Sequence, residues 1–339
     1  MQLRVALIGF GVVGQSVCEV LMSKSESLSN TNDFSCLVVG VSDLRWGTVF
    51  NNDGLDLGQL LTEARDTGKF CKNLTDWDSH TLIRRCDADA VVELSYTDLE
   101  TGEPAISHCR TAIETGKSVI TSNKGPPALA HRELSELARH KGVQFLFEAC
   151  VLSGTPVFNL AHSCLTGNTI TEIRGILNGT TNFMLDEMES GANYDVALAK
   201  AQELGYAEAR PDADVEGYDA LAKVVILANT LMGGDIEPSQ VPCRGITEID
   251  QNAVAEAKRE GRRYKLIGAI QRDGDGLSAR VCPEKLHLND PLSSVSGVNN
   301  ALTLKTDLLG EITMIGPGAG PTATGYAVVG DLMRILTVH

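Results

Sequence analysis

The sequence predicts an α/β protein in which a doubly wound parallel sheet is followed by a second domain of α+β type. Two observations predict this class. Short apolar runs alternate with helical stretches through residues 1–148, an order typical of β-α-β units. After Glu148 the alternation stops, and helices and strands follow in mixed order. The length of 339 residues is enough for about two domains, each with its own core.

Each element of the first domain is expected from a local pattern. The apolar run 4–8 predicts a strand, and the spacing of Val17, Val20 and Leu21 predicts a helix behind it. The polar stretch 23–35 predicts a loop. Further strands are expected at 37–41, 90–94, 118–120 and 144–147, with helices at 104–114 and 131–141.

The second domain is expected to open with a helix from Leu152 to Leu165. Near the other end of the chain, the glycine-rich stretch 316–320 interrupts the pattern before an apolar helix at 322–336. Between these two helices, strands are expected at 169–177, 264–271 and 277–283, with helices at 194–204 and 219–231.

The composition argues against several kinds of partner. There are 44 Asp and Glu against 29 Lys and Arg, a net charge of −15, whereas nucleic acids and anionic membranes attract cationic surfaces. No apolar run reaches the roughly 18 residues of a membrane helix. The 9 cysteines include no C-x-x-C pair, which favours free thiols in a reducing cytoplasm and argues against a structural zinc site.

A glycine motif follows the first predicted strand directly. In Gly9-Phe10-Gly11-Val12-Val13-Gly14, the first glycine allows a tight turn, the second lets a pyrophosphate approach the backbone, and the third lets the helix pack on its strand. The anion then meets the helix N-terminus. A glycine-rich turn without a ligand is the alternative, but the position between strand and helix favours NAD or NADP binding.

The second strand ends at Asp43, where a carboxylate can bind the ribose hydroxyls of NAD. Arg45, two residues later, could instead bind the 2′-phosphate of NADP. Both could equally be solvated loop charges, because their distance from the glycine motif exceeds the usual ~20 residues. The sequence leaves the cofactor phosphate open.

The turn Thr121-Ser122-Asn123-Lys124 follows another strand at its carboxyl end, where open α/β sheets bind ligands. Lys124 could orient a substrate carbonyl or exchange its proton there. A simple loop cation is the other interpretation.

The stretch 205–223 places several carboxylates ahead of one lysine. Asp219 and Lys223 are four residues apart on a predicted helix and therefore share one face. An exposed ion pair is one interpretation. However, Lys223 stands among apolar residues, so its charge needs a partner, and Asp219 is the obvious one.

Taken together, these motifs resemble homoserine dehydrogenase. The match extends from the first strand to the last helix, and its most specific blocks are residues 178–182 (Asn-Gly-Thr-Thr-Asn) and 214–223. The motifs that carry the resemblance are the glycine loop 9–14, the turn 121–124, residues 175–183, 205–208, 214–219 and 318–320. The chain is similar to the short form of this family, which lacks a regulatory or aspartate kinase domain.

The resemblance implies interconversion of L-aspartate 4-semialdehyde and L-homoserine with NAD(P), in threonine and methionine biosynthesis. It implies that Lys223 is the catalytic lysine, held by Asp219, and that Lys124 is the other lysine of the active site. Which lysine delivers the proton stays open. Substrate binding is expected at Glu208 and Asp214, which would hold the ammonium, and at Asn178, Gly179 and Thr180, which would line the pocket. The expected cofactor-binding residues are Gly9, Phe10, Gly11, Val12, Val13, Gly14, Asp43, Arg45, Thr121, Ser122, Lys124, Gly318 and Gly320.

The resemblance also implies a sodium ion, a homodimer and a C-terminal helix that returns to the first domain. The expected sodium ligands are Glu148, Val151, Ser153 and Thr155, although Cys150, Leu152 and Ser153 depart from the commoner family pattern. The expected domains are 1–148 with 316–339 for the nucleotide, and 149–315 for catalysis and dimerisation.

Two other functions compete with this interpretation. An acylating semialdehyde dehydrogenase would use Cys150 as its nucleophile, but a thiol of that kind needs a histidine partner, and only His162 is near in sequence. We therefore expect a packed thiol. A non-catalytic NAD-binding sensor would need only the glycine loop, and the Asp219–Lys223 helix argues against it.

Overall fold

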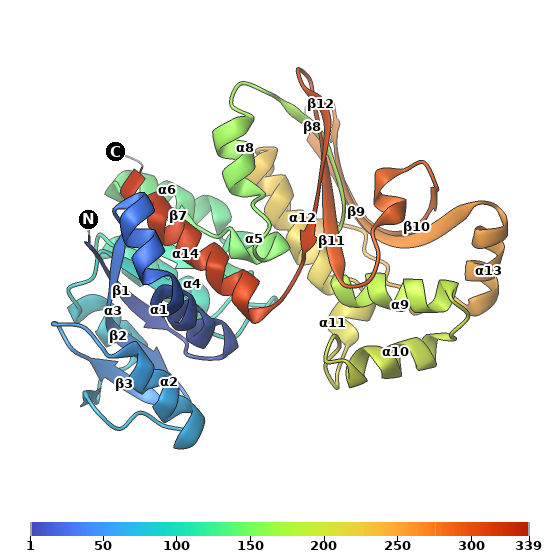
Figure 1. Cartoon of the computed structure of the whole chain (residues 1–339). Helices are drawn as coiled ribbons and strands as arrows, with labels where there is room; N and C mark the ends of the chain where they lie inside the picture. The colour runs from blue at the N-terminus through green and yellow to red at the C-terminus, as the bar shows by residue number, and fades with distance from the viewer. Residues whose placement is uncertain (1, 275, 338–339) are drawn as a thin grey trace. The chain divides into compact units, whose positions relative to one another are not determined.

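The computed structural model describes residues 2–274 and 276–337. It divides the chain into two compact units: unit 1 comprises residues 1–150 with 320–339, and unit 2 comprises residues 151–319. Figure 1 follows both units along the chain by colour. None of the helices in the described residues has the length and apolar character that a membrane crossing requires.

Unit 1 contains a seven-stranded sheet in the order β4-β3-β2-β1-β5-β6-β7. The strands β2, β1, β5, β6 and β7 pair in parallel, which confirms the predicted doubly wound sheet. The strands β3 and β4 continue the sheet beyond β2 and pair antiparallel. The strands are β1 (Gln2–Ile8), β2 (Ser35–Asp43), β3 (Gly47–Phe50), β4 (Leu74–Thr75), β5 (Ala90–Glu93), β6 (Ser118–Thr121) and β7 (Phe145–Leu146).

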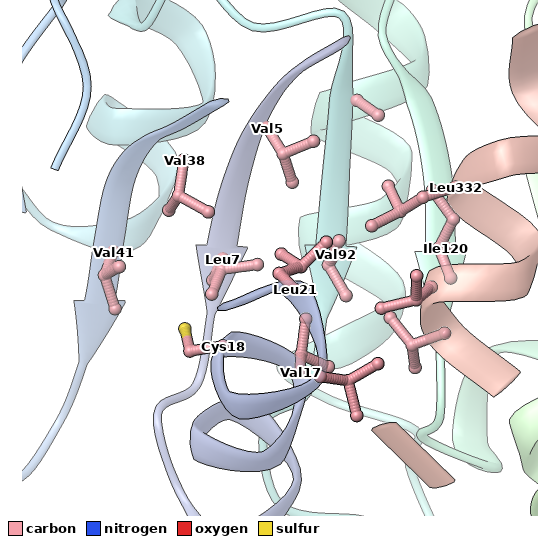
Figure 2. Packing of buried hydrophobic residues seen from close by; sticks show 14 of the residues in the cluster. Val5, Leu7, Val17, Cys18, Leu21, Val38, Val41, Val92, Ile120 and Leu332 are labelled. Carbon is pink, nitrogen blue, oxygen red and sulfur yellow. The ribbon is translucent and has the colours of Figure 1, made fainter. Parts of the chain in front are cut away.

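Helices cover both faces of this sheet, because alternate strand residues are apolar on each side. Leu7 faces α1, α2 and α14, and the neighbouring Ile8 faces α3, α4 and α6. The residues of the first core that Figure 2 labels are Val5, Leu7, Val38, Val41, Val92 and Ile120 from the strands, and Val17, Cys18, Leu21 and Leu332 from α1 and α14. The helices are α1 (Val12–Asn32), α2 (Leu57–Asp66), α3 (Ser79–Arg85), α4 (Ala105–Glu114), α5 (Gly125–Leu129), α6 (His131–Lys141) and α14 (Pro321–Thr337).

The loop predicted at 23–35 is wrong, because α1 continues to Asn32. Its buried first turns anchor the helix, and Leu28 still packs against the core. The polar residues of the second half then extend the helix into solvent, since propagating a helix costs less than starting one. Asp33, in the left-handed conformation at φ 50°, ends the helix by donating its N–H to the carbonyls of Leu28 and Ser29.

Unit 2 contains a five-stranded antiparallel sheet in the order β10-β9-β8-β11-β12. Core residues of one face include Ile176, Ile267 and Ala301. The strands are β8 (Ile170–Ile176), β9 (Arg262–Asp273), β10 (Gly276–His287), β11 (Asn299–Thr306) and β12 (Gly310–Pro317). The helices of unit 2 are α8 (Phe158–Cys164), α9 (Gly179–Glu189), α10 (Tyr194–Glu203), α11 (Asp212–Val215), α12 (Tyr218–Leu231) and α13 (Gln251–Arg259), with short 3-10 turns at Pro238–Gln240 and Pro291–Ser294.

The single helix predicted from Leu152 to Leu165 is wrong. The chain instead forms α7 (Ala149–Leu152), which contains the boundary between the units, and then α8. Ser153 has a positive φ of 50°, which no continuous helix allows. Pro156 follows without an N–H to donate, so the new helix starts only at Phe158.

Candidate active site

The glycine loop of unit 1 connects β1 to the N-terminus of α1. Gly11 is the N-cap of α1 and the helix has no side-chain cap and no acidic residue in its first turn. The first amide groups of this helix therefore keep a positive partial charge that suits a phosphate. Phe10 is fully buried against Phe70, with ring centroids 5.3 Å apart, whereas Val12 is exposed and Val13 packs at the margin of the core.

The three glycines meet different demands. Gly9 has φ +100°, and a Cβ there would lie 2.5 Å from the carbonyl oxygen of Leu94. A Cβ on Gly14 would lie 2.6 Å from the carbonyl oxygen of Gly9. A Cβ on Gly11 would meet nothing within 4 Å. The fold itself therefore requires glycine at positions 9 and 14. At Gly11 the fold leaves open space, which a pyrophosphate can occupy, so the loop fits a dinucleotide.

Asp43, at the end of β2, binds the glycine loop directly. Its Oδ2 accepts from the Phe10 N–H at 2.7 Å, and its Oδ1 accepts from the Arg45 N–H at 2.7 Å. The Asp43 carboxylate is therefore held in place by the glycine loop and by the turn that follows β2. The Arg45 side chain is exposed, with its guanidinium carbon 5.1 Å from the centroid of the Trp46 ring.

The turn after β6 is ordered by its own polar side chains. The Thr121 hydroxyl donates to the Glu93 carbonyl at 2.9 Å, and the Asn123 amide donates to the carbonyls of Ser95 and Tyr96 at 3.1 and 2.8 Å. Half-buried Ser122 lies within the turn, and Lys124 follows as the N-cap of α5. The ends of β5 and β6 are thereby joined at the carboxyl edge of the sheet.

Cys150 is a packed thiol. It is 2% exposed and donates to the carbonyls of Thr121 and Asn123 at 3.3 and 3.4 Å. Burial raises its pKa well above the ordinary thiol value, and the nearby Lys124 charge only partly offsets this. A thiol that keeps its proton is a poor nucleophile, so the acylating alternative has no support from this residue.

Unit 2 brings Asn178, Asp214, Asp219 and Lys223 together, and we call these four residues the acid–lysine cluster. Lys223 Nζ donates to Asp219 Oδ2 at 2.8 Å and to the Leu177 carbonyl at 2.6 Å. Asn178 Nδ2 donates to Asp214 Oδ1 at 2.6 Å and to Asp219 Oδ2 at 2.9 Å. The predicted contact between Asp219 and Lys223 is confirmed, and the pair is buried rather than exposed.

The local sequence explains this geometry. Residues around Lys223 on α12 are apolar on every side, so the lysine is only 6% exposed and its ammonium must find acceptors inside the protein. One helical turn earlier, Asp219 supplies the first acceptor. The end of β8 supplies the second through the main chain of Leu177, a contact that the sequence pattern does not reveal.

A second buried lysine, absent from the sequence predictions, provides a comparison. Lys265 on β9 is 0% exposed and donates to Asn182 Oδ1, Asp186 Oδ1 and the Val295 carbonyl at 2.8, 2.7 and 2.7 Å. Burial lowers its pKa, and Asp186 opposes that change. An ammonium has three N–H donors, and Lys265 uses all three. In the described part of the chain, Lys223 uses two of its three donors.

The carboxyl group of Asp214 has a raised pKa, chiefly because burial penalises its charge. The hydrogen bond from Asn178 lowers the pKa, the neighbouring Asp219 charge raises it, and Lys223 and Thr180 lower it. Asp214 therefore ionises at a higher pH than an exposed aspartate does.

The other expected substrate residues have different surroundings. Glu208 is exposed, and within residues 2–274 and 276–337 its side chain makes no hydrogen bond. A Cβ on Gly179 would lie 2.6 Å from the Val298 carbonyl oxygen, so the fold itself requires this glycine. The Thr180 hydroxyl donates to the Tyr206 carbonyl at 2.6 Å.

Gly318 and Gly320 fall on either side of the boundary between the units. A Cβ on Gly318 would lie 2.0 Å from the amide carbon of Asn300, so no side chain fits there. Gly320 has φ +128°, and its carbonyl accepts from Thr324 at the start of α14.

The expected sodium ligands are also divided between the units, with Glu148 in unit 1 and the other three in unit 2. The Glu148 N–H donates to Asp331 Oδ2 at 2.9 Å, and the Thr155 hydroxyl donates to the Pro317 carbonyl at 3.4 Å. Among the described residues, no three His, Cys, Asp or Glu side chains form a metal cluster. These contacts do not show a cation-binding set.

Unit 1 has a helix N-terminus with room for the phosphates of a dinucleotide, and unit 2 has a buried lysine paired with an aspartate. The chain is accordingly an NAD(P)-dependent oxidoreductase. The family model described as homoserine dehydrogenase matches residues 156–333, and that of the homoserine dehydrogenase NAD binding domain matches residues 9–148. The chain belongs to the homoserine dehydrogenase family.

Individual relatives agree with this assignment. The chain is 42% identical to the NAD(+)-dependent homoserine dehydrogenase of Pseudomonas canavaninivorans, over 98% of this chain and 96% of that protein. It is 41% identical to the homoserine dehydrogenase of Methanocaldococcus jannaschii, over 98% of each chain. A solved hyperthermophilic archaeal homoserine dehydrogenase in complex with NADPH superposes with a TM-score of 0.86 at 28% identity, over 100% of this chain and 99% of that one.

Proposed function

We propose that Lys223 is the proton donor when L-aspartate 4-semialdehyde is reduced to L-homoserine. The observation that carries this proposal is the difference between the two buried lysines of unit 2: Lys265 has three protein acceptors, and Lys223 has two in the described residues. When bound, NAD(P)H supplies the hydride. As negative charge develops on the aldehyde oxygen, the remaining N–H of Lys223 stabilises it and transfers a proton.

The rest of the acid–lysine cluster has supporting roles in this proposal. Asp219 and the Leu177 carbonyl hold the ammonium and orient its third N–H. Asp214 supplies the negative charge that pairs with the substrate ammonium, and the exposed Glu208, six residues earlier in the sequence, joins on substrate binding. Gly179 and Thr180 keep the adjacent backbone in place. Lys124 belongs to unit 1 and is proposed to assist in orienting the substrate.

Steady-state oxidation of NADH and NADPH by L-aspartate 4-semialdehyde tests this function. Turnover that depends on the aldehyde and needs no phosphate is expected. A requirement for phosphate would indicate thiol acylation, and binding of the cofactor without turnover would indicate a sensor.

For the cofactor, we propose that the glycine loop 9–14 binds the pyrophosphate and that NAD is preferred to NADP. Asp43 is held by the Phe10 and Arg45 amides, so its negative charge stays at the end of β2, where it accepts ribose hydroxyls and repels a 2′-phosphate. The Arg45 guanidinium is exposed and lies over the Trp46 ring, with its central carbon 5.1 Å from the ring centroid. A lower KM for NADH than for NADPH is expected, and the reverse order would assign the main role to Arg45.

Four further proposals rest on the resemblance to the family. They are a homodimer, threonine and methionine biosynthesis as the pathway, a cytoplasmic location, and a sodium ion at Glu148, Val151, Ser153 and Thr155. The nine free cysteines support a reducing compartment. No reaction step is assigned to the cation. Light scattering tests the dimer, and activity in sodium chloride against tetramethylammonium chloride tests the ion.

A further inference from the structure

We infer that Asn178 is a positioning residue that keeps Asp214 and Asp219 ionised side by side. The inference rests on the proposed function, because it assigns the two acids different tasks. Asp219 would hold Lys223, and Asp214 would keep its charge for the substrate ammonium. Asn178 itself would touch neither the substrate nor the cofactor.

The orientation of the Asn178 amide is set by helix α9. Asn178 is the N-cap of α9, and its Oδ1 accepts from the Thr181 N–H at 2.9 Å and lies 3.0 Å from the Thr181 hydroxyl. A backbone N–H can only donate, so the amide oxygen must face the helix. The amide nitrogen therefore faces the two carboxylates.

Both hydrogens of this nitrogen are in use. One reaches Asp214 Oδ1 and the other reaches Asp219 Oδ2, so Asn178, which is 5% exposed, has no donor left for a ligand. Asn178 could still line the substrate pocket, but in this arrangement its amide nitrogen has no hydrogen to offer a substrate. The side chain acts through its two neighbours.

Two carboxylates within reach of one nitrogen repel each other, and such a pair normally takes up a proton. Lys223 neutralises Asp219 by binding the same Oδ2 that Asn178 binds. Asp214 is faced by Asn178 and Thr180 from one side and by Asp219 and Lys223 from α12. The side-chain hydrogen bond that Asp214 accepts comes from Asn178, and it lowers the pKa of Asp214 more than the nearby Thr180 does, whose hydroxyl donates to the Tyr206 carbonyl. Without the amide, Asp214 is the acid that would take up the proton.

Asn178→Asp tests this role with little change in shape. An aspartate still caps α9, since its carboxylate accepts from the Thr181 N–H, but it replaces two donors with a negative charge. Asn178→Ser also keeps a cap and adds no charge, so it decides the question if the aspartate variant does not fold. Asn193→Asp is the matched control, because exposed Asn193 caps α10 by accepting from the Val196 N–H at 2.9 Å, outside the cluster.

The first readout is the pH profile of kcat/KM for L-aspartate 4-semialdehyde. Relative to the wild type and to Asn193→Asp, the acid limb of Asn178→Asp is expected to move upward by about one pH unit, and that of Asn178→Ser by less. On that limb kcat/KM then falls about tenfold. A loss of structure alone would lower kcat/KM equally at every pH, and that result, or unchanged acid limbs in both folded variants, would overturn the inference.

The second readout needs no turnover. A carboxyl group whose pKa is raised by folding stabilises the folded state at low pH, and this contribution is lost as the pH rises through the folded pKa. The free energy of unfolding of Asn178→Asp should therefore fall more steeply between about pH 4 and pH 7 than that of Asn193→Asp. Equal slopes would overturn the inference. If the wild type fails to reduce the semialdehyde, the proposed function is wrong, and this measurement still decides the role of Asn178.

Discussion

Replacing Lys223 by methionine should separate the stability of unit 2 from its catalytic activity. The Lys223 and Asp219 side chains are 7% and 16% exposed, with Nζ and Oδ2 2.8 Å apart. Methionine keeps most of the apolar stem and removes the ammonium that pairs with Asp219. Breaking a buried ion pair costs about 3–5 kcal/mol, and because Asn178 still donates to Asp219, we expect about 3 kcal/mol.

The activity should respond differently in the double variant. Lys223→Met is expected to lower kcat about 10²–10⁴-fold without weakening cofactor binding, the usual range for a positioned acid. Adding Asp219→Asn removes the carboxylate charge that Lys223 had neutralised and should recover most of the stability. It should not recover kcat, because the proton donor is still missing and effects within one unit are not additive.

Urea unfolding and steady-state kinetics with the semialdehyde measure both effects. Lys200→Met is the control, because Lys200 pairs with Glu187 at 2.7 Å while its side chain is 49% exposed. This variant should lose less than about 1 kcal/mol and keep its kcat. Near-wild-type kcat in folded Lys223→Met, or a double variant no more stable than the single one, would refute the reasoning.

Three further predictions address unit 1. Gly11→Val should fold normally, since a Cβ there meets nothing within 4 Å. Calorimetry should detect no NAD(P) binding to this variant, and an unchanged affinity would show that the loop does not bind the dinucleotide. Cys150→Ser should keep most activity, and a kcat loss beyond roughly a thousandfold at normal stability would restore the acylating mechanism. Lys124→Ala should lower kcat less than Lys223→Met does, whereas an equal loss would leave the proton donor undecided.

Much of the fold could be predicted because buried strands and amphipathic helices repeat with different periods. The strands predicted at 4–8 and 37–41 lie within β1 and β2, and the strand predicted at 90–94 is β5, which ends one residue earlier at Glu93. The strands β3 and β4 are not predicted, because only two residues of β3 and none of β4 are buried, so neither has the continuous buried apolar run of β5. The second half of α1 was missed for a different reason: its polar residues face solvent, and the helix depends on the buried turns before it.

The contacts of the candidate site also differ in how far they can be predicted from the sequence. The contact between Asp219 and Lys223 follows from helical spacing, which is local information. The amide of Asn178 meets Asp214 and Asp219 across 36 and 41 residues of sequence, and no spacing rule relates them. Lys265 did leave a signal, since a lysine between Tyr264 and Leu266 interrupts an apolar strand and must find acceptors there.

The outer strands of the two sheets have consequences for self-association. Unit 1 ends its sheet in β4 and β7, each of two residues, which offer little backbone to another chain. The sheet of unit 2 ends in β12, of 8 residues, and in β10, of 12 residues, the longer edge and the one whose length most favours intermolecular strand pairing. There the N–H and carbonyl of Val281 are bound by the segment 242–244, and Pro283 has no N–H to offer. A partly unfolded chain that loses this segment would expose the longer edge as well, so release of the segment should increase aggregation on heating.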